Sequence, residues 1–376
     1  MPKNQKSLIS LFFEHPRKVM KIENFLLFGT RNTEHKMIYR SKAPLRLGLA
    51  GGGTDVAPFS DLFGGAILNA TISMYAYATI EPIDGDKIIL NAVDKEEVFE
   101  YKSALELPLD GNLDLITGIY NRVIKDFVKK PLSFKLSTFV DAPPGSGLGS
   151  SSTLAVAVLG AFTEWLKLPL GEYDMAHLAY EIERVDLKMA GGKQDQYAAT
   201  FGGVNFMEFF KEDKVIVNPL RIRTKYLNEL AHNLVLYYTG TSRLSSVIIE
   251  SQSKNVRSNN QKTIEAMNQL KRQAVLMKEA ILKGELERIG ELLDFGWEFK
   301  KQMASGITNP AIDEIYDAAK ARGASGGKIS GAGGGGFMFF YCPDNTRHEV
   351  IKAVESFGGK IKRYEFTKQG LTTWTI

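Results

Sequence analysis

The sequence contains one cysteine, Cys342, among 376 residues. A single thiol excludes a disulfide framework and a zinc site built on several cysteines. Long apolar runs are also lacking. The two longest uncharged stretches, 62–80 and 142–163, are interrupted by glycines and hydroxyl residues, so neither supplies the about 20 apolar residues of a membrane-spanning helix. We therefore expect a protein without a membrane partner.

No signal peptide is expected from the first residues either. Residues 7–13 are apolar and follow a basic start, but Glu14, His15 and Pro16 interrupt the run. No small-residue cleavage site follows closely, as a secretory signal would require. We therefore expect a cytoplasmic protein.

Excess charge of one sign is absent from most of the chain. The 47 Lys and Arg exceed the 43 Asp and Glu by only four. Residues 1–36 carry seven of the basic and three of the acidic side chains, which leaves 40 of each sign in residues 37–376. A neutral body lacks the basic face that nucleic acids require, so we expect no nucleic-acid partner. Residues 1–36 are interpreted as an extension that is dispensable or disordered.

Strand and helix patterns alternate from residue 37 onward. Period-two alternation predicts strands at 38–49, 66–80 and 132–140, and apolar spacing predicts a helix at 113–128. Near 215–225 the pattern changes to long, charged amphipathic helices, predicted at 244–283 and 286–303 with another from Pro310 to Ala321. The order of elements predicts an α+β fold. The change in composition predicts an N-terminal domain of residues 37–220 and a C-terminal domain of residues 221–376.

Glycine is abundant, with 35 residues, and many of them lie in a few short segments. One segment, residues 143–152, falls between a predicted strand and a predicted helix. Its glycines let backbone N–H groups approach an anion, and a helix N-terminus adds further donors and a partial positive charge. No Walker A motif occurs in the chain. An ordinary tight turn is the alternative, but three glycines together with the three consecutive serines 150–152 favour a phosphate-binding loop. The residues expected to bind the phosphate groups are Pro144, Gly145, Ser146, Gly147, Leu148, Gly149, Ser150, Ser151 and Ser152.

A second glycine-rich segment covers residues 326–336. Gly331–Gly336 formally matches G-x-G-x-x-G, but it precedes a strand instead of opening a helix. That context excludes the dinucleotide-binding fingerprint. Two interpretations stay open: a close approach to another loop or a ligand, and a flexible hairpin.

Acidic residues gather shortly after the phosphate-binding segment. Glu181 and Glu183 are two apart on a predicted helix, so they face different sides. Asp195 follows Gly191 and Gly192 on a predicted loop. A carboxylate beside a phosphate loop is what magnesium-assisted phosphoryl transfer needs. The histidines show no metal-ligand spacing.

Three segments, in this order, resemble the GHMP kinase superfamily: Ala43–Asp55, Pro143–Ser152 and Lys328–Gly336. The resemblance spans about residues 38–376. It implies a two-domain α+β fold with an N-terminal domain like domain 2 of ribosomal protein S5 and a ferredoxin-like C-terminal domain. It also implies ATP and Mg²⁺ as cofactors and a kinase activity.

The resemblance assigns roles to individual residues. The 143–152 loop would bind the ATP phosphates, and Ser151 and Glu183 match magnesium ligands. Asp195 matches the catalytic aspartate, with Arg46 as its basic partner at the substrate. The remaining expected substrate contacts are Thr54, Asp55, Gly333 and Gly334. Gly331–Gly336 would lie against the phosphate loop.

The residues before Thr54 indicate a branch of the family. Galactokinases have Glu-His there, whereas this chain has Gly52 and Gly53. The segment resembles the sugar-1-kinases that include the kinase of D-glycero-D-manno-heptose 7-phosphate, and this implies phosphorylation of an anomeric hydroxyl on a sugar phosphate. Such a substrate needs a second anion site, for which Arg243 and Lys193 are candidates; an N-cap with a surface arginine is the alternative at Arg243.

Several alternatives in function stay open at this point. They are another sugar-1-kinase of the fucokinase, glucuronokinase or galactokinase type, a non-catalytic nucleotide and sugar sensor, and a nicotinamide-dependent dehydrogenase. The expected partner is a small sugar or sugar phosphate, and the expected oligomeric state is a monomer or a homodimer.

Overall fold

The computed structural model describes residues 37–241 and 245–376. The strands are β1 (Tyr39–Ala50), β2 (Gly65–Pro82), β3 (Lys87–Ala92), β4 (Glu97–Lys102), β5 (Phe134–Val140), β6 (Val204–Phe209), β7 (Val215–Pro219), β8 (Leu234–Tyr238), β9 (Gly326–Ile329), β10 (Phe337–Tyr341), β11 (Lys360–Lys362) and β12 (Thr372–Thr375). The α-helices are α1 (Phe59–Phe63), α2 (Asp114–Val123), α3 (Ser150–Leu166), α4 (Glu172–Glu181), α5 (Gln194–Phe201), α6 (Thr224–Asn233), α7 (Ser245–Arg257), α8 (Gln261–Lys283), α9 (Arg288–Lys300), α10 (Pro310–Ala321) and α11 (Arg347–Glu355). A short 3₁₀ turn (Val93–Lys95) and two π-helical turns (Ile124–Val128 and Ile182–Asp186) complete them.

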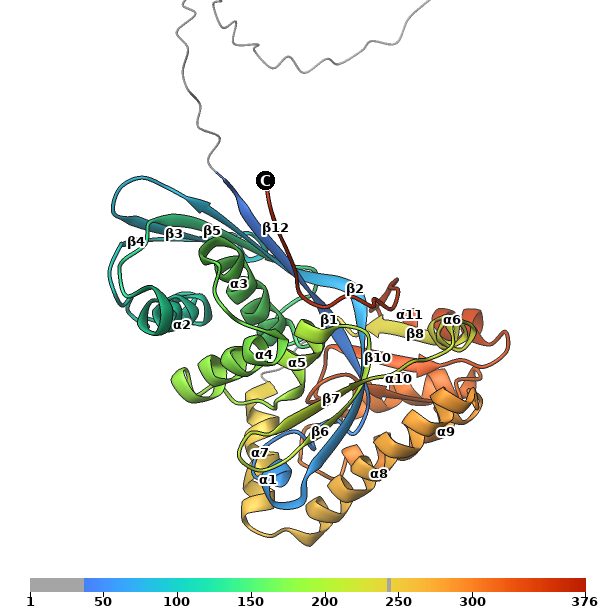
Figure 1. Ribbon diagram of the computed structural model, residues 1–376. Coiled ribbons are helices and arrows are strands. Elements are labelled where there is room, and N and C mark those ends of the chain that lie inside the picture. Colours follow the sequence, from blue (N-terminus) through green and yellow to red (C-terminus); the bar gives the residue numbers. More distant parts are fainter. Residues whose placement is uncertain (1–36, 242–244) are drawn as a thin grey trace, which may run out of the picture. The chain divides into compact units, whose positions relative to one another are not determined.

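The first sheet has eight strands in the order β12-β1-β2-β5-β3-β4, with β6 paired to β2 and β7 to β6. Among the strand pairs of the described residues, only β3 and β5 run parallel. Buried apolar residues of β1, β2 and α3 belong to one core, and α3 packs on β1 and β2 (Figure 1). Shifts of register in β1 after Pro44 and after Gly48 bend the strand beside the site described below. This sheet therefore carries the phosphate loop at the end of β5.

The second sheet is antiparallel, in the order β11-β8-β10-β9. Along the chain its strands and helices alternate as β8, helices, β9, β10, α11 and β11, which is the β-α-β-β-α-β pattern of ferredoxin-like units. Its apolar core includes the buried rings of Trp297 and Phe340. The expected α+β class and ferredoxin-like second unit agree with this arrangement. The proposed boundary at residues 220 and 221 stays a prediction, and the last strand, β12, returns to pair with β1.

Some expected elements differ in the structure. The helix expected over 244–283 is two helices. Asn259 breaks it with a left-handed φ of +55°, and the Asn260 side chain caps α8 by accepting a hydrogen bond from the Thr263 N–H. Asp195 lies in the first turn of α5 and not on a loop. The start of the second glycine-rich segment, including Lys328, is strand β9.

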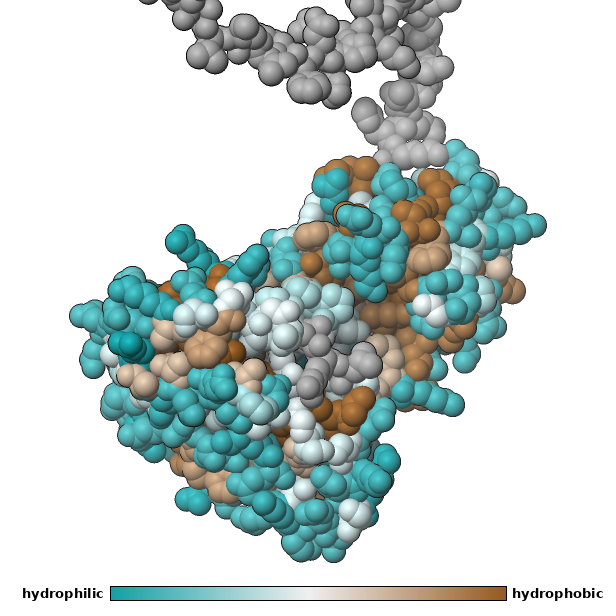
Figure 2. Space-filling model, turned by 180° about the vertical axis from the view of Figure 1, so that it is seen from behind, coloured by the Kyte–Doolittle hydropathy of each residue, from teal (hydrophilic) through white to brown (hydrophobic). Residues whose placement is uncertain are grey.

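Hydrophilic residues cover most of the face seen in Figure 2, with smaller hydrophobic patches between them. Within residues 37–241 and 245–376, no helix combines the length and apolar character that crossing a bilayer requires.

Candidate active site

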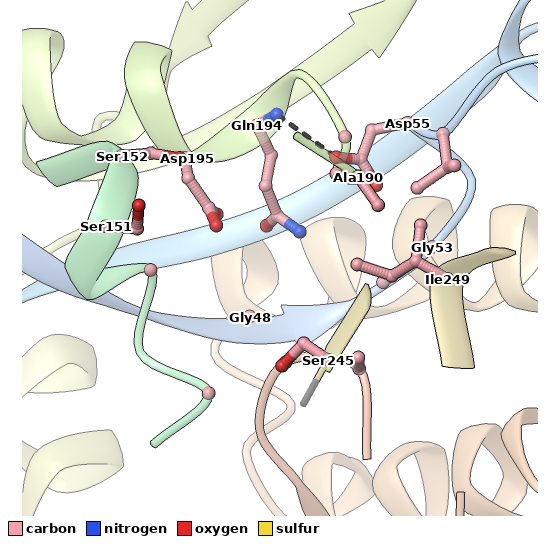
Figure 3. Close-up of a pocket in the computed structure, with 18 of the residues that line it drawn as sticks. Gly48, Gly53, Asp55, Ser151, Ser152, Ala190, Gln194, Asp195, Ser245 and Ile249 are labelled. Carbon is pink, nitrogen blue, oxygen red and sulfur yellow. Dashed lines mark hydrogen bonds between the residues drawn. The ribbon is translucent and has the colours of Figure 1, made fainter. Parts of the chain in front are cut away.

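A cleft lies where the loops after β1, β5 and β9 meet the segment before α5 (Figure 3). Helices α7 and α9 close its other side. Its polar and charged lining residues are Arg46, Asp55, Ser150, Ser151, Ser152, Glu183, Arg184, Gln194, Asp195, Ser245, Gln252, Lys300 and Lys328. The cleft therefore collects residues from all three segments that carry the sequence resemblance.

The phosphate loop (residues 143–152) is held open by left-handed glycines. Gly147 has a φ of +85°, and a Cβ there would lie 2.3 Å from the carbonyl oxygen of Ser330. The Ser330 hydroxyl donates to the Gly147 carbonyl over 2.8 Å, and Phe337 N–H donates to Ser146 O over 2.9 Å. The second glycine-rich segment thus lies directly against the phosphate loop, which confirms the close-approach interpretation over the flexible hairpin.

Arg46 and Asp195 form a two-point ion pair beside this loop. Nε of Arg46 lies 2.7 Å from Oδ1 of Asp195, and Nη2 lies 2.9 Å from Oδ2. Nη1 donates to the Gly147 carbonyl over 2.6 Å. The Arg46 side chain is 4% exposed and that of Asp195 is 20% exposed. The carboxylate is therefore fixed at the phosphate loop while still open to the cleft.

Ser151 and Glu183 face each other across the start of α3. The Ser151 hydroxyl lies 3.4 Å from Oε1 of Glu183, whereas Gln196 donates to Oε2 over 2.5 Å. Glu183 is completely buried in the π-helical turn, with Arg184 Nη1 3.7 Å from Oε1. A hydroxyl and a carboxylate oxygen this close suit a hard divalent cation such as Mg²⁺. Glu181 turns away to an ion pair with Arg122, as the spacing of the two glutamates predicts.

Thr54 and Asp55 differ in their surroundings. The Thr54 hydroxyl is buried and is used inside the protein. Its oxygen accepts from the Ala66 N–H over 3.1 Å, and its proton can be donated to Gly51 O or Ala66 O, which lie 2.8 and 3.0 Å away. Asp55 lines the cleft and accepts a hydrogen bond from the Gln194 N–H over 3.1 Å. Burial and the nearby Asp195 charge raise the pKa of Asp55. Only Asp55 of this pair is open to a substrate.

Three other expected substrate residues, Lys193, Gly333 and Gly334, do not line the cleft. The Lys193 ammonium lies 2.7 Å from Asp213 and 3.2 Å from Asp61, and its residue is absent from the cleft lining. Gly333 and Gly334 pack on the backbone of Ile307 instead of facing the cleft, where Gly331 and Ala332 are found. Arg243 lies outside the described residues.

Three residues of the cleft were not predicted from the sequence as site residues: Gln194, Lys300 and Lys328. Gln194 lies between Asp195 and Asp55 in Figure 3, and its Oε1 is buried without a hydrogen-bond partner among the described residues. Lys300 is the last residue of α9, Lys328 is the residue before the last of β9, and both are almost completely buried. Lys328 is the first residue of the segment Lys328–Gly336 that resembles the kinase family, so it could have been predicted as a site residue. Nothing in the sequence around Lys300 indicates a site.

A second cavity adjoins the cleft and shares Gly145, Ser150, Ser151 and Met189 with it. Its other walls are largely apolar and come from α2, β5 and α3, with side chains that include Leu113, Leu115, Ile116, Val140 and Leu154. An apolar cavity that opens onto a phosphate loop is shaped for a flat aromatic group attached to phosphates.

Comparison with known proteins adds independent evidence. Residues 114–203 match the model of the GHMP kinases N terminal domain, and residues 277–360 match that of the GHMP kinases C terminal. The chain is 48% identical over 337 residues to a D-glycero-alpha-D-manno-heptose 7-phosphate kinase of Campylobacter jejuni, covering 90% of this chain and 99% of that protein. It is 28% identical to an L-fucokinase/L-fucose-1-P guanylyltransferase of Bacteroides fragilis, over 88% of this chain and 37% of that longer protein.

A solved structure agrees with these relatives. The crystal structure of a D-glycero-D-manno-heptose 1-phosphate kinase from Bacteroides thetaiotaomicron has a TM-score of 0.77 and 46% identity, covering 90% of this chain and 99% of that one. The chain belongs to the GHMP kinase family. It is therefore a phosphotransferase with ATP as the phosphate donor, which excludes the dehydrogenase alternative and gives no support to the non-catalytic sensor.

Proposed function

We propose that the protein transfers the γ-phosphoryl group of ATP to the anomeric hydroxyl of a sugar phosphate, with D-glycero-D-manno-heptose 7-phosphate as the substrate. The product would be the 1,7-bisphosphate. The observation that carries the proposal is the Arg46–Asp195 pair held against the phosphate loop. The relative named as a heptose 7-phosphate kinase, with its nearly full-length match, supports the choice of sugar.

ATP would lie across the two adjoining cavities. The apolar cavity suits the base, and the backbone N–H groups of residues 145–149 with the N-terminus of α3 suit the phosphates. Ser151 and Glu183 would hold Mg²⁺, which neutralises charge on the phosphates when bound.

Asp195 would accept the proton of the attacking sugar hydroxyl. A carboxylate acts as a general base only when it is held within hydrogen-bond reach of that proton. The two hydrogen bonds from Arg46 orient the carboxylate, and the guanidinium adds positive charge near the transferred group. Asp55 and Gln194 supply an acceptor and an amide for other sugar hydroxyls.

A panel of substrates tests the proposal. ADP formation is measured with ATP and heptose 7-phosphate, free heptose, fucose, galactose and glucuronate. We expect the highest kcat/KM with heptose 7-phosphate and a product phosphorylated on C1, identified by ³¹P NMR. A higher kcat/KM for fucose would favour the fucokinase alternative, which the Bacteroides fragilis relative supports.

We also propose that the enzyme works in the cytoplasm. A monomer or a homodimer remains the predicted state.

A further inference from the structure

Two lysines line the cleft without a carboxylate partner. Lys300 is 3% exposed and Lys328 is 4% exposed. Within residues 37–241 and 245–376, the Lys300 ammonium makes no hydrogen bond and no ion pair, and Lys328 donates only to the Gly48 carbonyl, over 2.9 Å. Burying an unpaired ammonium costs stability, so such a group indicates a ligand of opposite charge.

The two ammonium groups converge on one place. The position that a Cβ of Gly52 would occupy lies 3.8 Å from Nζ of Lys328 and 3.9 Å from Nζ of Lys300. Because Gly52 has no side chain, this space stays open to the cleft. A single tetrahedral anion that rests on the Gly52 backbone would contact both lysines.

The electrostatics of the two lysines agree with this geometry. Burial lowers the pKa of Lys300 to about 8, and burial together with the Lys300 charge lowers the pKa of Lys328 well below its usual range. Asp55 is the acidic group that acts on Lys300, but it forms no ion pair with it in the part of the chain described. A bound dianion would relieve this unfavourable concentration of positive charge.

Lys328 is anchored at a different point of β1 from the residue that contacts the phosphate loop. Arg46, which contacts the phosphate loop, is an interior residue of β1, and Gly48, whose carbonyl accepts from Lys328, follows two residues later. Two residues of strand correspond to about 7 Å, comparable to the width of a sugar ring. An anion at the lysines would therefore lie further along β1 than a hydroxyl that faces Asp195.

We propose that Lys300 and Lys328 bind the phosphate group that the sugar already carries, an inference that rests on the sugar-phosphate substrate proposed above. Neither Lys193, whose ammonium is occupied by two carboxylates, nor the uncharged wall formed by Ile249 and Val56 offers this chemistry. The lysine pair would make the enzyme select a phosphorylated sugar over the free sugar.

The test compares Lys300→Met with Lys301→Met, the same change at the adjacent residue, whose ammonium pairs with Glu298 outside the cleft. Binding of heptose 7-phosphate and of free heptose is measured by calorimetry in the presence of a non-hydrolysable ATP analogue. We expect the native protein and Lys301→Met to prefer the phosphorylated sugar strongly. In Lys300→Met this preference falls by at least about tenfold, as the loss of a hydrogen bond between charged groups implies.

A second variant tests the same site without removing a lysine, so that a folding defect of Lys300→Met can be recognised. Gly52→Ala adds one methyl group at ordinary van der Waals distance from both ammonium groups, and it should reduce the same preference by occupying the anion's place. Thermal unfolding of both variants is recorded as a check, and Lys300→Met should unfold at the native temperature or above because it removes a buried charge.

The outcomes separate the two proposals. A preference for the phosphorylated sugar that persists in both variants overturns the lysine site while leaving the proposed function intact. Equal losses for both sugars also overturn it, since the lysines then act on the transferred group. If the native protein phosphorylates free sugars and shows no preference for heptose 7-phosphate, both the substrate assignment and the lysine site are wrong.

Discussion

Arg46 and Asp195 are 149 residues apart in the chain and meet through two hydrogen bonds of 2.7 and 2.9 Å. One residue comes from the middle of β1 and the other from the first turn of α5. The third arm of the guanidinium holds the carbonyl of Gly147. This pair therefore ties the proposed base to the loop that would bind ATP, and its rigidity gives the first prediction.

Arg46→Lys should lower kcat by about tenfold to a hundredfold, because one ammonium cannot replace a planar fork whose charged hydrogen bonds are worth about 1.5–3 kcal/mol each. Steady-state kinetics check this result. Arg122→Lys is the matched control, since Arg122 binds Glu181 and Asp186 away from the cleft. Equal effects of the two changes on kcat would contradict a special role for Arg46.

Glu183→Gln should raise the Mg²⁺ concentration needed for half-maximal activity by at least about tenfold, because a metal loses a charged ligand. The measurement is a magnesium titration at saturating ATP and sugar. Glu181→Gln, two residues away and paired with Arg122, should leave the titration unchanged. An unaltered magnesium requirement in Glu183→Gln would remove Glu183 from the proposed metal site.

Gly147→Ala should lower the free energy of unfolding by about 2–4 kcal/mol, from left-handed backbone strain and from overpacking. The added Cβ would lie 2.3 Å from Ser330 O at a φ of +85°. Gly85→Ala is the control, since Gly85 has a φ of +105° but no atom within 4 Å of its Cβ position. Urea denaturation should show the larger loss for Gly147→Ala, and equal losses would contradict tight packing of the two loops.

The affinity for a sugar phosphate should decrease as the pH rises through about 8. Burial lowers the pKa of Lys300 to about 8, so its ammonium is charged below that pH and neutral above it. The nearby Arg46 charge also lowers the pKa of Lys300, and the Asp55 charge opposes this shift. The pKa of Lys328 is lowered well below its usual range by burial and by the charges of Lys300 and Arg46. The KM for heptose 7-phosphate, measured from pH 7 to 9.5, should therefore rise.

Lys300→Met provides the control for this pH dependence. Its KM should be higher at neutral pH and should change less between pH 7 and 9.5, because the titrating ammonium is gone. The same rise in KM in this variant would show that another group controls binding.

The glycine-rich segments and their chemistry were predictable from the sequence because they depend on local backbone conformation. Gly147 and Gly331 need left-handed φ values and a close approach, and both requirements leave a visible glycine pattern. The same holds for the start of α10, where Asn309 caps the helix and Pro310 occupies its first position.

Side-chain direction was less predictable. Lys193 and Asp195 are two apart around the start of α5, and on a helix such residues point to different sides. Lys193 accordingly turns to Asp213 while Asp195 faces the cleft. The position of Lys300 in the cleft could not be predicted from the sequence, because its burial depends on how α9 packs in the folded protein.

The most direct measurement is the rate of ADP formation from ATP and heptose 7-phosphate by the native protein and by Asp195→Asn, with Asp317→Asn, an exposed change on α10, as control. We predict turnover by the native protein and the control, and a kcat lower by about 10²–10⁴-fold in Asp195→Asn with ATP-analogue binding retained. Near-native turnover by Asp195→Asn, or no ADP formation by the native protein, would contradict the account.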